Sequence, residues 1–275
     1  MINSFMRVGS ARPARAALTR FSLPVLLLLT VALGSAGLPA QELHVAAAAD
    51  LNYALTDLAR QFETRTGTKV ALTFGASGNF FSQIQNGAPF DLFFSADEDY
   101  PKKLAAQGRV DPASLRTYAI GHLVLWVPLS SSLDLEKLQM DALLQNQVTR
   151  IAIANPQHAP YGRAAMAAIE HFGLKDKTAP KLVLGENVSQ AAKFVQSGNA
   201  QAGLIALSLA KSPAMASAGK YWQVPADAYP ELRQAAAIVS ASSQKKTAQA
   251  FLDFVLSSDG AAVLSRYGLT PASRP

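Results

Sequence analysis

The most constraining feature of this sequence is a regular alternation of short apolar runs with segments whose apolar residues recur at helical spacing. The apolar runs have the length and composition of buried strands, and most are followed by a helical segment. They cover residues 43–49, 69–74, 91–96, 150–155, 181–185 and 203–207. Strands alternating with helices predict an α/β fold, with mostly parallel sheets covered by helices on both faces.

Glycines mark the ends of several predicted helical segments. A glycine just past a helix end is the residue that most readily adopts the left-handed stop conformation. We expect such stops at Gly67, Gly87, Gly108, Gly173, Gly198 and Gly268.

Two stretches interrupt the alternation. Residues 116–128 form a long β-rich run without an intervening helix, and residues 235–240 have a similar character. A strand run of this kind can leave one sheet and enter another. Two such crossovers predict a discontinuous lobe I (residues 41–121 plus 236–275) and an inserted lobe II (residues 122–235). Two strands joining two lobes would form a hinge with a cleft beside it.

The first 40 residues have the three parts of a secretory signal peptide. An arginine-bearing start without acidic residues precedes an apolar stretch (residues 21–34) and then small residues. The apolar stretch is too short for a membrane span of ~20 residues, and Pro24 interrupts it. We expect cleavage between about residues 36 and 40, export to the periplasm and no membrane anchor.

Charge and cysteine content exclude several functional classes. The whole chain has 25 basic and 19 acidic residues. Without the four arginines of the leader, 21 basic and 19 acidic residues remain, a net charge of only +2. No basic stripe or nucleic-acid-binding module is present, so nucleic acid is not an expected partner. The absence of cysteine excludes disulfides, cysteine zinc sites, thiol nucleophiles and lipidation at a processed cysteine.

Four strand-to-helix turns share one arrangement, in which small residues run into a predicted helix start. Ligands of open α/β sheets bind at the carboxyl ends of strands, where helix N-termini converge. If each lobe contributes two turns, the cleft is ringed by backbone N–H groups and the hydroxyl of Ser77, a site for a small anion. Alternatively, Ser77 is an ordinary helix cap, Asn187 and Ser189 are capping residues, and Tyr161 is a surface aromatic residue. The turns are residues 46–50, 74–79, 155–162 and 184–190.

Beyond these turns, the chain resembles the periplasmic molybdate-binding proteins of ABC importers over essentially all of its length after the leader. The motifs that carry the resemblance are AAAADLNYAL (46–55), GASGNFFSQIQNGAPFDLFFSADEDYPKKL (75–104), TYAIGHLVLW (117–126), ANPQHAPYG (154–162) and ENVSQA (186–191). The resemblance implies a two-lobed type II periplasmic binding protein fold that closes on molybdate or tungstate. It also implies a membrane permease with its ATPase as partner, no cofactor and no catalytic activity. We expect a monomer.

The resemblance also implies which residues hold the oxyanion. Ser77 corresponds to a serine that offers its hydroxyl and backbone N–H, and Tyr161 and Val188 to residues that offer backbone N–H groups. The first turn aligns with Ala49 and Asp50, where relatives commonly present serine, threonine or asparagine. Molybdate would be bound as the intact oxyanion, without a separate cation site.

Two positions depart from the family pattern. Ala206 stands where some relatives use a tyrosine hydroxyl, so one contact is missing or comes from elsewhere. Asp50 would repel a dianion, since two charges ~4 Å apart interact by ~4 kcal/mol at an effective dielectric constant of ~20. We therefore interpret Asp50 as a cap of its own helix, with its side chain turned aside. The alternative is a carboxylate inside the pocket that accepts a hydrogen bond from a protonated oxyanion such as hydrogen phosphate.

Rival functions have weaker support. A receptor of the same fold for phosphate, sulfate or a small organic acid is the main alternative, because sequence does not give the cavity size. An exported hydrolase is a remote one, since GASGN is not a nucleophile-elbow motif and the four histidines show no triad spacing. Acidic residues 97–99 lack the spacing of a calcium loop and suit the N-terminus of the following helix.

Overall fold

A computed structural model of the chain describes residues 42–272, so the predicted leader lies outside the described residues. Each of the six apolar runs forms a strand, with ends within two residues of the prediction. Further strands lie between and after these six. In chain order, the strands of the described residues are β1 (Leu43–Ala48), β2 (Val70–Gly75), β3 (Leu92–Ser95), β4 (Arg116–Gly121), β5 (Leu123–Pro128), β6 (Ile151–Ala154), β7 (Leu182–Gly185), β8 (Ala202–Ala206), β9 (Gly219–Gln223), β10 (Leu232–Ile238) and β11 (Thr270–Pro271).

The strands form two sheets. The first has the order β11-β4-β10-β3-β1-β2, and the second has the order β7-β6-β8-β5-β9. Three neighbouring strands of each sheet pair in parallel, namely β3-β1-β2 and β7-β6-β8. The remaining pairs are antiparallel. The sheets are therefore mixed, because strands that arrive from the other sheet enter without a crossover helix.

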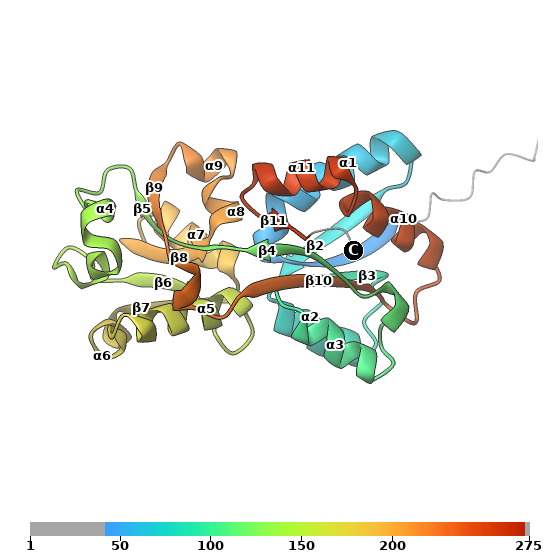
Figure 1. Cartoon of the computed structure of the whole chain (residues 1–275), viewed down its shortest axis with the longest axis horizontal. Helices are drawn as coiled ribbons and strands as arrows, with labels where there is room; N and C mark the ends of the chain where they lie inside the picture. The colour runs from blue at the N-terminus through green and yellow to red at the C-terminus, as the bar shows by residue number, and fades with distance from the viewer. Residues whose placement is uncertain (1–41, 273–275) are drawn as a thin grey trace, which may run out of the picture. The chain divides into compact units, whose positions relative to one another are not determined.

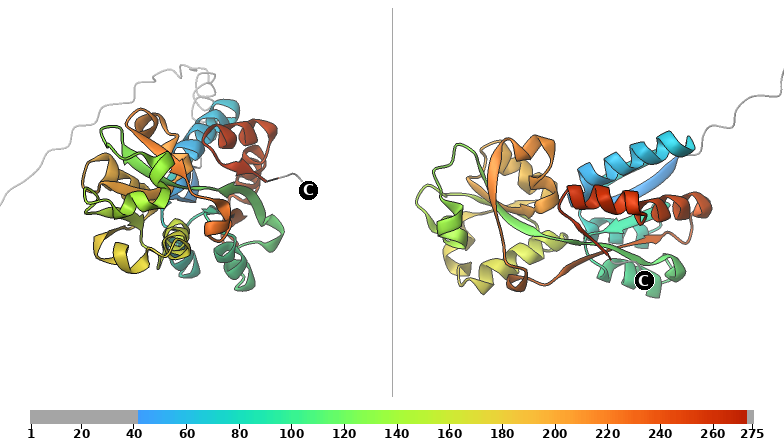
Figure 2. Two further views of the ribbon diagram at one scale, coloured as in Figure 1. Left: turned by 60° about the vertical axis from the view of Figure 1, so that its left-hand side comes forward. Right: turned by 45° about the horizontal axis from the view of Figure 1, so that its top comes forward.

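Helices cover both faces of the first sheet (Figure 1). Alternate side chains of β1 point to opposite faces: Val45 and Ala47 belong to the core that includes α1, α10 and α11, whereas Ala46 packs with residues of α2 and α3. Figures 1 and 2 show α1, α10 and α11 gathered on the first of these faces. The second sheet has one continuous core, in which α5 and α7 pack on β6 and β8.

The predicted glycine stops lie at helix ends. Each of the six predicted stop glycines has a positive φ; Gly67, for example, ends α1 with φ 72° and donates its N–H to Glu63 O at 2.8 Å. The α-helices are α1 (Asn52–Thr66), α2 (Ser77–Gln85), α3 (Asp99–Ala106), α4 (Leu135–Leu138), α5 (Pro160–His171), α6 (Lys175–Thr178), α7 (Val188–Gln196), α8 (Leu207–Ala210), α9 (Pro213–Ala216), α10 (Lys245–Val255) and α11 (Ser258–Arg266). Short 3-10 helices are η1 (Ala49–Leu51), η2 (Pro112–Ser114), η3 (Gln139–Leu144), η4 (Ala179–Lys181) and η5 (Ala226–Ala228).

The chain passes between the two sheets twice, each time without an intervening α-helix. His122 alone separates β4 of the first sheet from β5 of the second. The return runs from β9 of the second sheet to β10 of the first. The long β-rich run of residues 116–128 is thus the place where one sheet is left and the other entered.

Candidate anion-binding site

One small cavity brings together the five residues singled out from the sequence. Two of the strand-to-helix turns that supply them follow β1 and β2 of the first sheet, and two follow β6 and β7 of the second. Its walls are otherwise made of small residues and proline. The cavity is lined by Ala48, Ala49, Asp50, Gly75, Ser77, Ala96, Ala159, Pro160, Tyr161 and Val188.

Three helices begin at this cavity. α2 begins at Ser77, α5 at Pro160 and α7 at Val188. The N–H groups of a first helical turn have no carbonyl partner inside the helix, and the positive end of the helix dipole lies there. Main-chain N–H groups of Ser77, Tyr161 and Val188 therefore stand in positions that suit hydrogen bonds to an anion. Pro160 has no N–H, so at α5 this role falls to Tyr161.

Ser77 does not cap a helix, in contrast to one of the sequence alternatives. The N-cap residue of α2 is Ala76, and no side chain caps this helix. The Ser77 side chain is fully buried, and its Oγ accepts a hydrogen bond from the backbone N–H of Ala96 at 3.0 Å. A hydroxyl that accepts in this way still has its own proton to donate. The capping alternative is correct for Asn187, because Asn187 Oδ1 accepts from Gln190 N and caps α7.

The interpretation of Asp50 as a helix cap is wrong. No side chain caps η1 or α1. The carboxylate is instead buried, with 1% of the residue exposed, and its Oδ2 accepts a hydrogen bond from Gln234 Nε2 at 2.7 Å. Its Oδ1 is buried and has no hydrogen-bond partner among the described residues. The chain turns through η1 before α1 starts, which takes the carboxylate away from the N-terminus of α1 and toward β10.

Gln234 is the centre of a buried polar network that sequence analysis missed. Its Nε2 also donates to Tyr161 Oη at 3.2 Å, and its Oε1 accepts from Tyr118 Oη at 2.8 Å. Tyr118 Oη further donates to Ser95 O at 3.1 Å. Gln234 is fully buried and stands alone as an uncharged polar residue in the apolar strand β10. The sequence signal that could have identified Gln234 is a polar residue at a strand position whose side chain is expected to be buried.

Burial dominates the electrostatics of the network. Desolvation raises the pKa of Asp50 from 3.8 to about 6, although hydrogen-bond interactions with Gln234, with the Tyr161 hydroxyl and with its own backbone N–H oppose the rise. Burial likewise raises the pKa of the Tyr161 and Tyr118 hydroxyls well above 10, and the nearby Asp50 charge adds to this effect. Tyr161 is therefore a neutral, buried residue rather than a surface aromatic. Its hydroxyl is a hydrogen-bonding group and not an acid.

Polar contacts connect the two halves of the cavity wall. Gly78 N, in the first turn of α2, donates to His158 O at 2.8 Å. The hydroxyl of Ser208, in α8, donates to the backbone oxygen of Asp50 at 2.7 Å. Arg163, in α5, forms an ion pair with Asp97, which follows β3. Each contact joins a residue near the first sheet to one near the second.

Other residues considered from the sequence lie outside the cavity. Ala206 ends β8, is buried and does not line the cavity. His158 contributes its carbonyl rather than its ring to the contacts around the site. In the acidic segment 97–99, Asp97 Oδ1 accepts from Tyr100 N at 3.1 Å, as expected of an acid at a helix start. Among residues 42–272, no group of three or more acidic or histidine side chains is placed to hold a metal ion.

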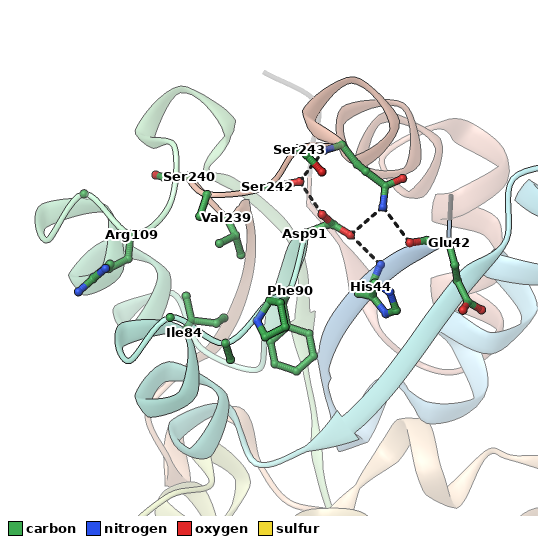
Figure 3. Close-up of a pocket in the computed structure, with 16 residues that line it drawn as sticks. Glu42, His44, Ile84, Phe90, Asp91, Arg109, Val239, Ser240, Ser242 and Ser243 are labelled. Carbon is green, nitrogen blue, oxygen red and sulfur yellow. Dashed lines mark hydrogen bonds between the residues drawn. The ribbon is translucent and has the colours of Figure 1, made fainter. Parts of the chain in front are cut away.

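A larger pocket lies elsewhere on the first sheet (Figure 3). It has a volume of about 450 Å3 and is lined by residues that include His44, Asp91, Arg109 and Gln244. Asp91 accepts hydrogen bonds from His44 N at 2.8 Å, Ser242 Oγ at 2.6 Å and Gln244 Nε2 at 3.2 Å. Since both of its carboxylate oxygens are occupied, Asp91 ties the start of β1 to the segment before α10. We regard this carboxylate as structural.

Residues 43–270 match the model of the family described as bacterial extracellular solute-binding protein. The chain is 41% identical to the molybdate-binding protein ModA of Azotobacter vinelandii over 244 residues, 87% of this chain and 96% of that protein. It is 36% identical to ModA of Rhodobacter capsulatus over 229 residues, 83% and 88% of the two chains. The structure of the periplasmic molybdate-binding protein of Azotobacter vinelandii superposes with a TM-score of 0.79 at 37% identity, covering 84% of this chain and 100% of that one.

Proposed function

The chain belongs to the family of bacterial extracellular solute-binding proteins, and we propose from this premise that it captures molybdate for an ABC importer. The matched relatives are molybdate-binding proteins and not enzymes. The fold is the two-lobed type II periplasmic binding protein fold. Tungstate is part of the proposal, because it is a tetrahedral dianion of nearly the same size and presents the same oxygens.

The observation that carries the proposal is the meeting of four strand-to-helix turns around one buried cavity. Ala49, Asp50, Ser77, Tyr161 and Val188, which resemblance to the family singles out as ligands, all line it. We propose that backbone N–H groups and the Ser77 hydroxyl hold the oxygens of the anion. The anion then needs no cationic side chain beside it, since helix N-termini and oriented dipoles stabilise its negative charge.

We propose that each sheet with its helices forms one lobe, and that the two crossovers form the hinge. Lobe I would comprise residues 41–121 plus 236–275 and lobe II residues 122–235, apart from the first residues of β10, which pair in the first sheet. The cavity has a volume of about 10 Å3, room for about one water molecule. A tetrahedral oxyanion is larger, so it enters when the lobes part. Closure then follows because both lobes contact the anion.

Export of the chain is also part of the proposal. Relatives of this chain include a protein described as periplasmic, and residues 1–40 have the pattern of a removable signal peptide. Over the described range, every helix is too short or too polar to cross a membrane. The proposed partner is a permease with its ATPase, which receives the anion from the closed, monomeric form.

Calorimetric titration of residues 41–275 tests this proposal. Molybdate, tungstate, sulfate and phosphate are titrated in turn at pH 7.5. We expect one-to-one binding of molybdate and tungstate and no heat of binding with sulfate or phosphate. Binding of phosphate without molybdate would replace the proposed ligand by another oxyanion. Absence of binding with all four would leave only the fold and direct the search to small organic acids.

A further inference from the structure

We propose that the site binds its oxyanion together with one proton, which Asp50 takes up from solvent as the anion enters. The proposal rests on the proposed function, since it requires a dianionic ligand in the cavity lined by Asp50. Under this proposal, Asp50 is the residue that makes ligand capture depend on pH. In the complex, its carboxylic acid would donate a hydrogen bond to an oxygen of the anion.

The first argument is the unequal use of the two carboxylate oxygens. Oδ2 accepts from Gln234 Nε2 at 2.7 Å, whereas no donor among the described residues reaches the buried Oδ1 in hydrogen-bond geometry. The Tyr161 hydroxyl also interacts with the carboxylate, but more weakly than Gln234 does. A buried polar atom without a partner costs free energy comparable to a lost hydrogen bond. Asp91 shows the contrast, because both of its oxygens are occupied by donors. Asp50 thus has one oxygen left for a function in the cavity that it lines.

The second argument is charge. An oxyanion presents only acceptor oxygens, and an ionised Asp50 presents only acceptors as well. Like charges lining one small cavity repel each other, and they do so more strongly in a buried site than in water. Protonation of Oδ1 converts this repulsion into an O–H···O bond to a charged acceptor, which is among the stronger hydrogen bonds in proteins. One proton therefore removes the conflict between the acidic side chain and a dianionic ligand.

The groups around Asp50 do not supply a positive charge that would keep it ionised. Gln234 of β10 and Tyr161 of α5 are neutral, and so is Tyr118 of β4, which lies beyond Gln234. From α8, the Ser208 hydroxyl contacts the backbone oxygen and not the carboxylate. From α7, Lys193 lines a neighbouring pocket with Ala49 and forms no ion pair with Asp50 among the described residues.

Burial also raises the pKa of Asp50 toward neutral pH, where binding of an anion can change its protonation state. Its pKa of about 6 in the unliganded protein means that the carboxylate is almost fully ionised at pH 7.5. A dianion beside it raises the pKa further, because like charges disfavour the ionised form. Binding at pH 7.5 should then consume close to one proton. As the pH rises from 6.5 to 8.5, the affinity should fall by roughly 50- to 100-fold.

The test is calorimetric titration of residues 41–275 with molybdate in buffers of low and high ionisation enthalpy. These titrations are repeated from pH 6.5 to 8.5, where molybdate itself is deprotonated. The slope of observed enthalpy against buffer ionisation enthalpy gives the number of protons taken up. We expect close to one at pH 7.5 for the unaltered chain. A slope near zero together with a flat pH profile would overturn the proposal.

Two variants assign the proton to a residue. Asp50→Asn resembles the protonated acid, with an amide that donates and an oxygen that accepts from Gln234. It should bind molybdate without proton uptake and with a flat pH profile. Asp97→Asn is the matched control, because burial raises the pKa of this second cleft carboxylate as well. Proton uptake should persist in Asp97→Asn; its loss there would assign the proton to Asp97 and overturn the proposal.

The outcomes also separate this inference from the proposed function. Molybdate binding without proton uptake would leave the receptor function intact and refute only the role of Asp50. Failure of all four oxyanions to bind would refute the receptor function first. Binding of hydrogen phosphate alone, without proton uptake, would show that Asp50 stays ionised and accepts from a ligand that is already protonated.

Discussion

The hydroxyl of Ser77 accepts a hydrogen bond from the backbone N–H of Ala96 at 3.0 Å, inside a cavity wall from which solvent is excluded. This contact orients the serine and leaves its own proton to be donated. It connects the start of α2, which the resemblance to relatives places beside the ligand, with the residue that follows β3. The rotamer of Ser77 is therefore set before any anion arrives.

Replacing Ser77 by alanine should weaken molybdate binding by about ten- to hundredfold, because one hydrogen bond to a charged acceptor is lost. The N–H of Ala96 also loses its acceptor. Calorimetric titration measures the change. Ser82→Ala is the matched control, since Ser82 lies on the same helix, donates to Gly78 O and does not line the cavity. An equal loss in both variants would show an effect on α2 rather than on the ligand.

Replacing Asp50 by asparagine should stabilise the unliganded protein above pH 6. The pKa of Asp50 is raised from 3.8 to about 6 by burial, so the folded state binds more protons than the unfolded state between these values. The free energy of unfolding therefore falls as the pH rises from about 4 to about 6, and ionised Asp50 costs roughly 3 kcal/mol above that range. Urea unfolding at pH 4, 6 and 8 without oxyanion should show a gain in the variant at pH 8 and none at pH 4.

Asp91→Asn provides the contrast for this stability measurement. The Asp91 carboxylate accepts three hydrogen bonds, so the substitution replaces an acceptor oxygen by a donor that faces other donors. Its expected effect is a loss of roughly 1–3 kcal/mol. If both asparagine variants destabilise the protein at pH 8, the ionised Asp50 carboxylate does not destabilise the folded state as we expect.

Replacing Gly78 by alanine should lower molybdate affinity by tenfold or more while changing stability little. A Cβ at this position would lie 2.6 Å from Tyr100 Oη and 2.8 Å from His158 O, closer than van der Waals contact allows. The tip of the Tyr100 side chain, on α3, can turn aside, but the His158 carbonyl is main chain. Because His158 follows β6 of the second sheet, the clash with its carbonyl opposes the closed arrangement rather than the packing of either sheet. Small-angle scattering with molybdate should report a less compact protein, and Gln83→Ala on the exposed side of α2 should behave as the unaltered chain.

Replacing Arg163 by glutamine should raise the dissociation constant by about two- to fivefold, mainly through faster dissociation. Arg163 forms an ion pair with Asp97 and a hydrogen bond with Tyr100 Oη at 3.3 Å, and it lies over the Tyr100 ring. The pair is partly exposed, so its contribution is modest and salt-dependent. Stopped-flow measurements in low and high salt should show the difference shrinking in high salt. Arg60→Gln, which breaks an exposed pair with Asp57, serves as control.

Local sequence determined much of the fold. Each apolar run became a strand, and each predicted stop glycine has a positive φ, because burial and left-handed backbone geometry are properties of a few adjacent residues. Strand β9 was missed, since GKYWQ lacks a continuous apolar run and Trp222 is its one side chain that packs against the core. The mixed direction of the sheets was also missed, because pairing direction depends on where the chain returns.

The sequence by itself determined that small residues at four strand-to-helix turns suit an anion, and resemblance pointed to five of the ten residues that line the cavity. Only the tertiary structure decided the role of Asp50. Its partner, Gln234, lies 184 residues away along the chain, and no local pattern reports a contact of that separation. The capping interpretation was wrong because a side chain at a helix start has competing hydrogen-bond partners, and β10 brings an amide to the carboxylate that the helix does not. The direction of a buried carboxylate is thus decided by the elements packed around it.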